Sequence, residues 1–141
     1  MSQLEDYEAI RRLIALYAQL LDAKRLDEWG EVFTFDAIFE VWGKTFEGRS
    51  EIVKAIGGMQ PEFPGKHVSL TPVIDLLGNG RARAWTDFSA FASSKDGITI
   101  ATMGRYHDDL VLQGGRWRFA RRVVVMPGEA LPKGVAPSPG V

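Results

Sequence analysis

The sequence predicts an α+β fold in which a curved antiparallel sheet wraps around N-terminal helices and encloses a cone-shaped pocket. One observation behind this prediction is a stripe of apolar residues at helical spacing near the N-terminus. Another is a long apolar hairpin from Ile98 to Val125. Helices gathered before a run of antiparallel strands are typical of α+β architecture. A cavity between such a helix and such a sheet is a natural site for a small molecule.

The first expected helix runs from about Leu4 to Ala23. Ser2 followed by Glu5 can form a capping box at its start. The apolar stripe that predicts this amphipathic helix consists of Ile10, Leu13, Ile14, Tyr17 and Leu21.

Shorter elements are expected in the next part of the chain. Ser50 is a suitable N-cap for a helix, and Gly57-Gly58 would end that helix. The full set is a helix over residues 26–33, a strand–turn–strand unit over 37–46 that turns at Gly43-Lys44, and a helix over 51–56.

Four long strands in an antiparallel meander are expected to follow. Two of them cover His67 to Leu77 and Arg81 to Ser93, and the other two are the arms of the hairpin, joined by Gln113-Gly114-Gly115-Arg116. Side chains alternate between the two faces of a strand. One face of the first arm should therefore carry Thr102, Gly104, Tyr106, Asp108 and Leu110. One face of the second should carry Trp117, Phe119, Arg121, Val123 and Val125.

We expect one domain, residues 1–126, followed by an irregular tail, residues 127–141. A chain of 141 residues suits a single hydrophobic core. The tail contains four prolines and three glycines without hydrophobic periodicity, and we expect it to be disordered from Gly134.

Composition argues against several classes of partner and cofactor. The 17 basic and 18 acidic residues leave a net charge of -1 and form no basic cluster, so no nucleic acid or anionic membrane is expected as a partner. No segment has the apolar length of a membrane span, and the N-terminus lacks the apolar segment of a signal peptide. The absence of cysteine is compatible with a cytoplasmic location. There is no phosphate-binding glycine loop, and we expect neither a metal nor a cofactor.

Four segments resemble the SnoaL-like branch of the nuclear transport factor 2-like superfamily. They are YAQLLDAKRLDEWGEVFTFDAIFEV, GRSEIVKAI, the strand that begins at His67, and GRYHDDLVLQGGRWRFARR. The last segment follows the branch's pattern Gly-x-Tyr-x-Asp-x-Leu, Gly-x-Trp, Arg. The resemblance extends from about Tyr7 to Val125 and implies a cystatin-like α+β barrel. The fold hosts many activities, so it does not by itself define the function.

Within that branch, the chain resembles scytalone dehydratase, bile-acid 7α-dehydratase and hexachlorocyclohexane dehydrochlorinase. Those enzymes have an aspartate at the end of the first helix and a histidine at the start of the strand after the third helix, and Asp22 and His67 occupy these positions. Tyr17 matches a pocket tyrosine of the bile-acid enzyme, and Tyr106 falls near a pocket amide of scytalone dehydratase. Leu21 departs from the pattern because scytalone dehydratase has a tyrosine there.

The resemblance implies a cofactor-independent lyase, most simply a dehydratase, acting on a small hydrophobic cyclic or polycyclic substrate. His67 would be the general base or acid and Asp22 its orienting partner, because an imidazole can accept or donate a proton near neutral pH. Tyr17 and Tyr106 would donate hydrogen bonds to the substrate. Two alternatives stay open: a proton shuttle of the ketosteroid isomerase or polyketide cyclase type, and a non-catalytic binding protein. A structural role for Asp22 and His67 as a helix cap and a polar strand start is a further alternative.

Other residues of the strands are also candidates for contacts. The face with Trp85, Asp87 and Ser89 could line the pocket mouth or a subunit interface, and Trp85 and Ser89 are candidate substrate contacts. His107 is interpreted as a surface histidine, and one of Arg121 and Arg122 as a structural partner of a carboxylate. The aromatic residues expected mainly in the core are Trp29, Phe33, Phe39, Trp42, Phe88, Phe91, Trp117 and Phe119.

A homo-oligomer is also expected. Val124 and Met126 are expected on the outward face of the sheet, which would then be apolar enough to need a cover. The dehydratases that the chain resembles suggest a trimer, and other members of the branch a dimer.

Overall fold

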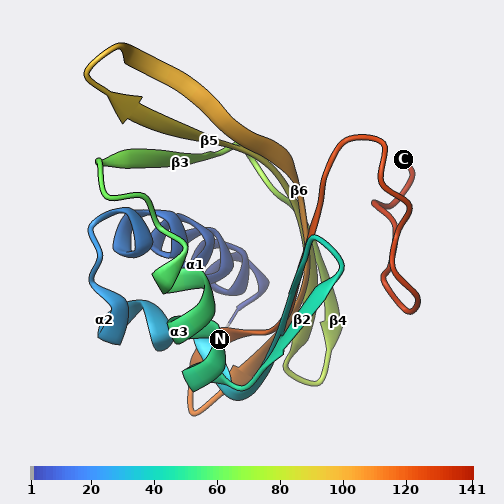
Figure 1. Cartoon of the computed structure of the whole chain (residues 1–141). Helices are drawn as coiled ribbons and strands as arrows, with labels where there is room; N and C mark the ends of the chain where they lie inside the picture. The colour runs from blue at the N-terminus through green and yellow to red at the C-terminus, as the bar shows by residue number, and fades with distance from the viewer. Residues whose placement is uncertain (1) are drawn as a thin grey trace.

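Three helices lie within the curve of one seven-stranded sheet in the computed structural model, which describes residues 2–141 (Figure 1). The α+β class is therefore confirmed. The helices are α1 (Gln3–Asp22), α2 (Leu26–Gly30) and α3 (Arg49–Gly58). The strands are β1 (Phe33–Val41), β2 (Lys44–Glu47), β3 (Gly65–Ser69), β4 (Val73–Gly78), β5 (Arg81–Ser94), β6 (Gly97–Gln113) and β7 (Arg116–Val125).

The sheet has the strand order β2-β1-β7-β6-β5-β3, and β4 also pairs with β5. All pairings are antiparallel except that of β1 with β7. The sheet is strongly curved and open, with β2 at one edge and β3 and β4 at the other, so the expected barrel does not close. The parallel pair arises because the chain between β1 and β7 forms the rest of the sheet before β7 returns beside β1.

Helix α1 begins and packs as the sequence predicts. The backbone N–H of Glu5 donates to Ser2 Oγ at 3.2 Å, and the backbone N–H of Ser2 donates to Glu5 Oε2 at 2.7 Å, which completes the capping box. The predicted apolar stripe is buried against the sheet along its whole length. Burial of this stripe places the C-terminal end of α1 beside β3.

Helix α3 does not begin in the expected way. Gly48, with φ at 89°, is its N-cap, and no side chain caps the helix, so the proposed N-cap Ser50 lies inside the first turn. The chain is instead fixed by Arg49, whose Nε and Nη2 donate to the carbonyl oxygen of Phe33 at 3.1 and 2.6 Å. Gly57 and Gly58 do not end the helix early, because they form its last residues.

The strand predicted from His67 to Leu77 is two strands, β3 and β4, separated by residues 70–72. Both pair with β5 in succession: Ser69 lies opposite Phe88, and Val73 opposite Trp85. Pro72 explains the interruption, because proline has no N–H to donate to a neighbouring strand.

A bulge in β7 changes which of its residues face the helices. Leu110 pairs with Phe119 while Asp109 pairs with Arg121, so Ala120 has no partner on β6. An extra residue reverses the alternation of faces beyond it. Trp117 and Phe119 share one face of β7, as predicted, and this face is the inward one. After the bulge, however, Arg122, Val124 and Met126 face inward in place of Arg121, Val123 and Val125. The proposed outward position of Val124 and Met126 is therefore wrong.

Arg122 forms a buried ion pair with Asp108 in the middle of the helix–sheet interface. Arg122 Nε and Nη2 donate to the Asp108 carboxylate at 2.8 and 2.9 Å, and both side chains have no exposed surface. The Cζ atom of Arg122 also lies 4.1, 3.8 and 4.1 Å from the ring centres of Tyr17, Tyr106 and Phe119. Arg121 also pairs with a carboxylate, Glu40, at 2.8 Å.

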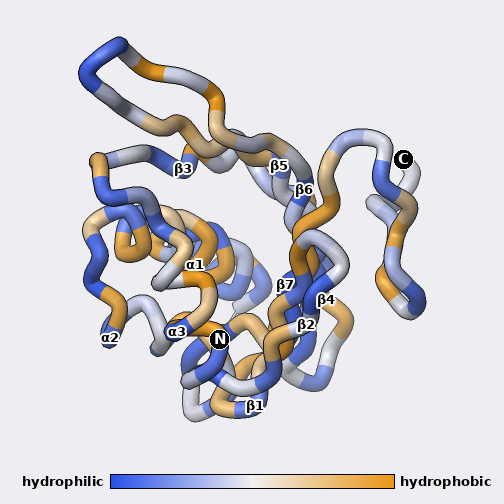
Figure 2. The backbone as a smooth tube through the Cα atoms, in the orientation of Figure 1, coloured by the Kyte–Doolittle hydropathy of each residue, from blue (hydrophilic) through white to orange (hydrophobic). Residues whose placement is uncertain are grey.

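The C-terminal tail lies against the outer face of the sheet, on the side away from the helices (Figure 1). Residues 127–141 form neither helix nor strand, and hydrophobic and hydrophilic stretches alternate along them (Figure 2). The segment after Gly134, expected to be disordered, is tied down at Ala136. The Ala136 carbonyl oxygen accepts a hydrogen bond from Trp85 Nε1 at 3.0 Å and lies 3.0 Å from His107 Nδ1. No helix formed by residues 2–141 is long and apolar enough to cross a membrane.

The adjacent residues Asp108 and Asp109 provide a matched test of the buried pair. We expect Asp108→Ala to lower the free energy of unfolding by about 3–5 kcal/mol, because it leaves the Arg122 charge buried without a partner. Asp109→Ala, which removes an exposed contact with Arg83, should cost less than about 1 kcal/mol. Urea denaturation measures both values, and equal losses in the two variants would contradict the importance of the buried pair.

Candidate active site

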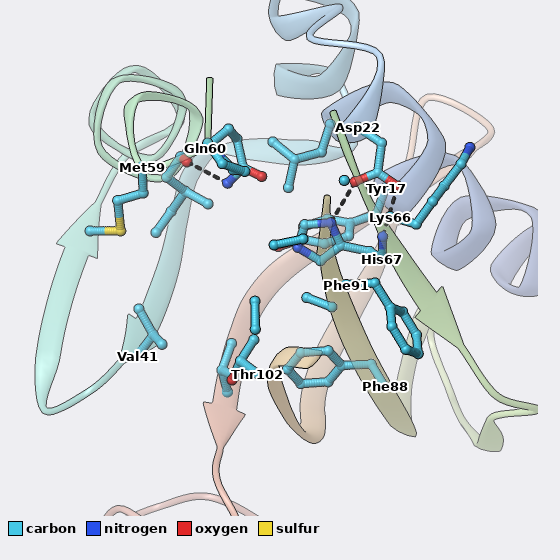
Figure 3. Close-up of a pocket in the computed structure, with 18 of the residues that line it drawn as sticks. Tyr17, Asp22, Val41, Met59, Gln60, Lys66, His67, Phe88, Phe91 and Thr102 are labelled. Carbon is cyan, nitrogen blue, oxygen red and sulfur yellow. Dashed lines mark hydrogen bonds and ion pairs between the residues drawn. The ribbon is translucent and has the colours of Figure 1, made fainter. Parts of the chain in front are cut away.

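A cavity of about 180 Å³ lies between the end of α1, the end of α3 and the inner face of the sheet. In Figure 3, Val41, Met59 and Gln60 lie on one side of it, and His67 and Phe88 on the other. Its lining is mainly apolar, and Asp22 is the one carboxylate that lines it among residues 2–141. Such a cavity suits a hydrophobic small molecule with few polar groups.

Asp22 and His67 meet in the wall of this cavity (Figure 3). Asp22 Oδ1 lies 2.6 Å from His67 Nδ1, and Asp22 Oδ2 accepts a hydrogen bond from the backbone N–H of His67 at 2.8 Å. The side chains of Asp22 and His67 are 8% and 17% exposed, so the pair is shielded but reachable. The hydrogen bond predicted between these two side chains is therefore present.

The contacts of Asp22 with His67 bear on which tautomer the imidazole adopts. An ionised carboxylate only accepts hydrogen bonds, so the Nδ1 atom of His67 carries the proton that it shares with Asp22. In the neutral ring, Nε2 then has the free lone pair. The backbone contact fixes the carboxylate as well, since both of its oxygens are occupied by one residue. The arrangement can hold a histidine ready to accept a proton at Nε2.

The end of α1 brings Tyr17 and Asp22 to the same cavity. Five residues separate them, which on an ideal helix turns their side chains well apart. The helix ends at Asp22, and Lys24, with φ at 56°, turns the chain away. Asp22 therefore lies at the last position from which an α1 side chain can reach β3.

Tyr17 and Tyr106 line the cavity from α1 and β6, as predicted for Tyr106. Their ring centres are 5.6 Å apart, and Tyr106 stacks on Phe88 at 4.0 Å. Burial raises the pKa of Tyr17 to about 12, although the nearby Arg122 charge opposes the rise. Burial likewise raises the pKa of Tyr106 well above its ordinary value. Both phenols keep their protons at neutral pH and can act only as hydrogen-bond donors or acceptors.

Arg122 lies behind these two rings and keeps its charge. Burial disfavours a charged guanidinium, but the carboxylate of Asp108 outweighs this effect and raises the pKa of Arg122. The cation contacts the faces of Tyr17 and Tyr106 and does not line the cavity. Its direct effect is on the orientation of the rings.

Trp85 and Ser89, selected as substrate contacts, do not line this cavity. They lie on the outer face of β5, where Trp85 is bonded to the tail and Ser89 lines a separate groove beside it. Strand alternation puts the even-numbered residues of β5 up to Ala90 toward the helices, so Trp85 and Ser89 face outward. The prediction that Trp85 and Ser89 contact a substrate in this cavity is therefore wrong.

His107 and two of the aromatic residues also differ from expectation. His107 is buried rather than exposed, because the tail covers it. Trp42 is 57% exposed at the β1–β2 turn and is not in the core. Phe91 is only half-buried.

Several cavity residues were not identified from the sequence. Phe88 belongs to a face of β5 whose other members are mainly small, a pattern that by itself indicates close packing and not a cavity. In the structure the small residues leave the space, and Phe88 forms part of its wall. Met59 and Gln60 come from the loop after α3, which has no periodicity from which a direction could be inferred. Residues 2–141 bring no three potential metal ligands of the His, Cys, Asp or Glu type together.

A model of the SnoaL-like domain matches residues 2–123. The chain belongs to the SnoaL-like family. No curated protein matches the sequence in a direct comparison.

Solved structures share the architecture of this SnoaL-like chain. An NTF2-like protein with a cystatin-like fold from Novosphingobium aromaticivorans is 22% identical over 90% of this chain and 85% of its own, with a TM-score of 0.82. A candidate scytalone dehydratase from the same organism is 23% identical over 95% and 97% of the two chains, with a TM-score of 0.78. ActVI-ORFA from Streptomyces coelicolor is 16% identical over 86% and 96%, also at 0.78. Identities this low establish the fold alone.

The buried phenols predict how stability changes in alkali. The Tyr17 pKa is about 12 in the folded chain, whereas an unfolded tyrosine ionises near about 10. Between about pH 10 and 12 the unfolded chain therefore binds fewer protons than the folded chain, so the free energy of unfolding falls as pH rises. The urea midpoint of the wild type should decrease over this range, and the decrease should be smaller in Tyr17→Phe. A midpoint that rises through the same range would contradict the assignment.

Proposed function

We propose that this SnoaL-like protein is a cofactor-independent lyase that eliminates water from a small cyclic or polycyclic apolar substrate. The observation that supports the proposal is the contact of 2.6 Å between Asp22 Oδ1 and His67 Nδ1 in the wall of an apolar cavity. An aspartate in this position orients the imidazole and stabilises the cation that forms when Nε2 accepts a proton. A polar pair in an apolar pocket costs stability, which favours a functional role.

The proposed reaction needs one group to remove a proton and to return it. His67 Nε2 would take the proton from the carbon next to a substrate carbonyl, and the electrons of that C–H bond would move toward the carbonyl oxygen as an enolate. The enolate would then form the new C=C bond as the C–O bond to the leaving hydroxyl breaks. The imidazolium would give its proton to this hydroxyl, so that water leaves and His67 returns to its neutral form.

Tyr17 and Tyr106 would stabilise the enolate in this scheme. Both phenols line the cavity and keep their protons because burial raises their pKa values. A protonated donor that is already fixed in place stabilises developing negative charge without reorganisation. The contacts of both rings with Arg122 support such a fixed position.

Isomerisation and cyclisation use the same proton acceptor and the same donors. They differ from elimination in the mass of the product, which loses water only in the lyase reaction. A suitable probe is a bicyclic β-hydroxy ketone of the hydroxytetralone type, because its dehydration yields a fluorescent naphthol. Mass spectrometry of the product therefore separates the lyase from its isomerase and cyclase alternatives.

The two histidines of the chain provide the test of the active site. We expect His67→Ala and Asp22→Asn each to lower the rate of naphthol formation by a factor of about 10²–10⁴, with nearly unchanged melting temperatures. His107→Gln, on the outer face of the sheet, should retain the wild-type rate. Wild-type rates in His67→Ala would remove the catalytic assignment. Probe binding without turnover, unchanged in His67→Ala, would instead indicate a binding protein.

A further inference from the structure

Trp42 occupies a backbone position that does not suit a large side chain. Val41 pairs with Lys44, so the turn between β1 and β2 consists of Trp42 and Gly43 rather than the predicted Gly43-Lys44. Their φ values are 52° and 71°, the pattern of a type I′ turn. Such turns favour Asn-Gly and similar pairs, because a bulky residue is strained at positive φ. Gly43 fits this turn and Trp42 does not.

The side chain of Trp42 adds little packing energy to offset the strained backbone of the turn. It is 57% exposed, whereas Trp29, Trp85 and Trp117 are at most 6% exposed. An exposed indole on a strained backbone contributes little core packing. Backbone strain of this kind is characteristically retained at functional sites. Trp42 also lines the cavity that contains Asp22 and His67.

Two further exposed apolar side chains line the same cavity. Met59 and Phe63, from the loop after α3, are 44% and 58% exposed. In Figure 3, Met59 lies on the opposite side of the cavity from His67. Exposed apolar residues from two separate segments therefore adjoin one cavity, and we call Trp42, Met59 and Phe63 the apolar rim.

We propose that the apolar rim binds the part of a polycyclic ligand that extends beyond the Asp22–His67 pair, and that Trp42 is a specificity-determining residue. A ligand ring against the indole removes apolar surface from water on both partners, which compensates for the exposed side chain and the strained turn. A ligand too small to reach the rim would bind without this contribution. The inference rests on the proposed function for the class of ligand, but the binding itself does not depend on proton transfer at His67.

Substitution of Trp42 by asparagine should stabilise the fold and weaken ligand binding. Trp42→Asn creates the Asn-Gly pair that a type I′ turn favours, so the melting temperature should rise. Loss of the indole should weaken the binding of naphthol, measured by calorimetry, by about tenfold or more. Trp42→Phe keeps an aromatic contact and should recover much of the affinity. A purely structural role for the indole would instead lower the melting temperature of Trp42→Asn.

Phe35 supplies a matched control. It is 84% exposed on strand β1, which leads into the turn that contains Trp42, and it does not line the cavity. Phe35→Asn should leave naphthol affinity unchanged, although it also removes an exposed aromatic side chain.

The exposure of Trp42 allows a direct measurement without substrate turnover. Because the other three tryptophans are buried, iodide should quench mainly the emission of Trp42, and Trp42→Phe should lose most of this quenching. Decahydronaphthol, which neither absorbs nor emits at these wavelengths, should protect the wild type from iodide as it fills the cavity.

Any of four results would overturn the proposal: a lower melting temperature in Trp42→Asn, unchanged naphthol affinity in that variant, iodide quenching that decahydronaphthol does not reduce, or no binding of either compound by the wild type. Failure of the proposed lyase would appear differently, either as no naphthol formation by the wild type or as naphthol formation that survives His67→Ala.

Discussion

The centre of this protein is arranged around the buried charge of Arg122. A guanidinium without solvent contact requires a carboxylate, and Asp108 on the neighbouring strand provides one in a two-point contact. The remaining surface of the cation is covered by the faces of Tyr17, Tyr106 and Phe119. Because these groups come from α1, β6 and β7, the interaction fixes the first helix against the centre of the sheet.

The candidate site depends on the position of this same helix. Tyr17 contacts the cation, and Asp22 lies about 1.4 turns further, at the end of α1. Asp22 holds both the ring and the backbone N–H of His67, which lies in the middle of β3 and not at the start of the strand as predicted. The helix is therefore fixed at one point by the contact of Tyr17 with the paired Arg122 cation and at another by the proposed catalytic pair. The cavity lies between these contacts, where small side chains of β5 leave space.

The two faces of the sheet carry different contacts. The inner face carries the cavity and the buried ion pair, and the outer face carries the tail, which Trp85 and His107 hold through the Ala136 carbonyl. Strand alternation alone separates Trp85 from Phe88, although only two residues lie between them. Neighbouring aromatic residues in one strand thus take part in unrelated contacts.

Local sequence determined the elements whose signals are short-range: the capped helix α1 with its buried stripe, and the β6–β7 hairpin with its glycine turn. The proximity of Asp22 and His67 followed from the family resemblance, because 45 residues separate them and no periodicity relates them. Tertiary structure alone decided the bulge at Ala120, which turned Arg122 inward, and the docking of the tail on His107. The physical reason is that alternation specifies a face only while register is maintained. One unpaired residue or one covering segment, both set by long-range contacts, changes which side chains are buried.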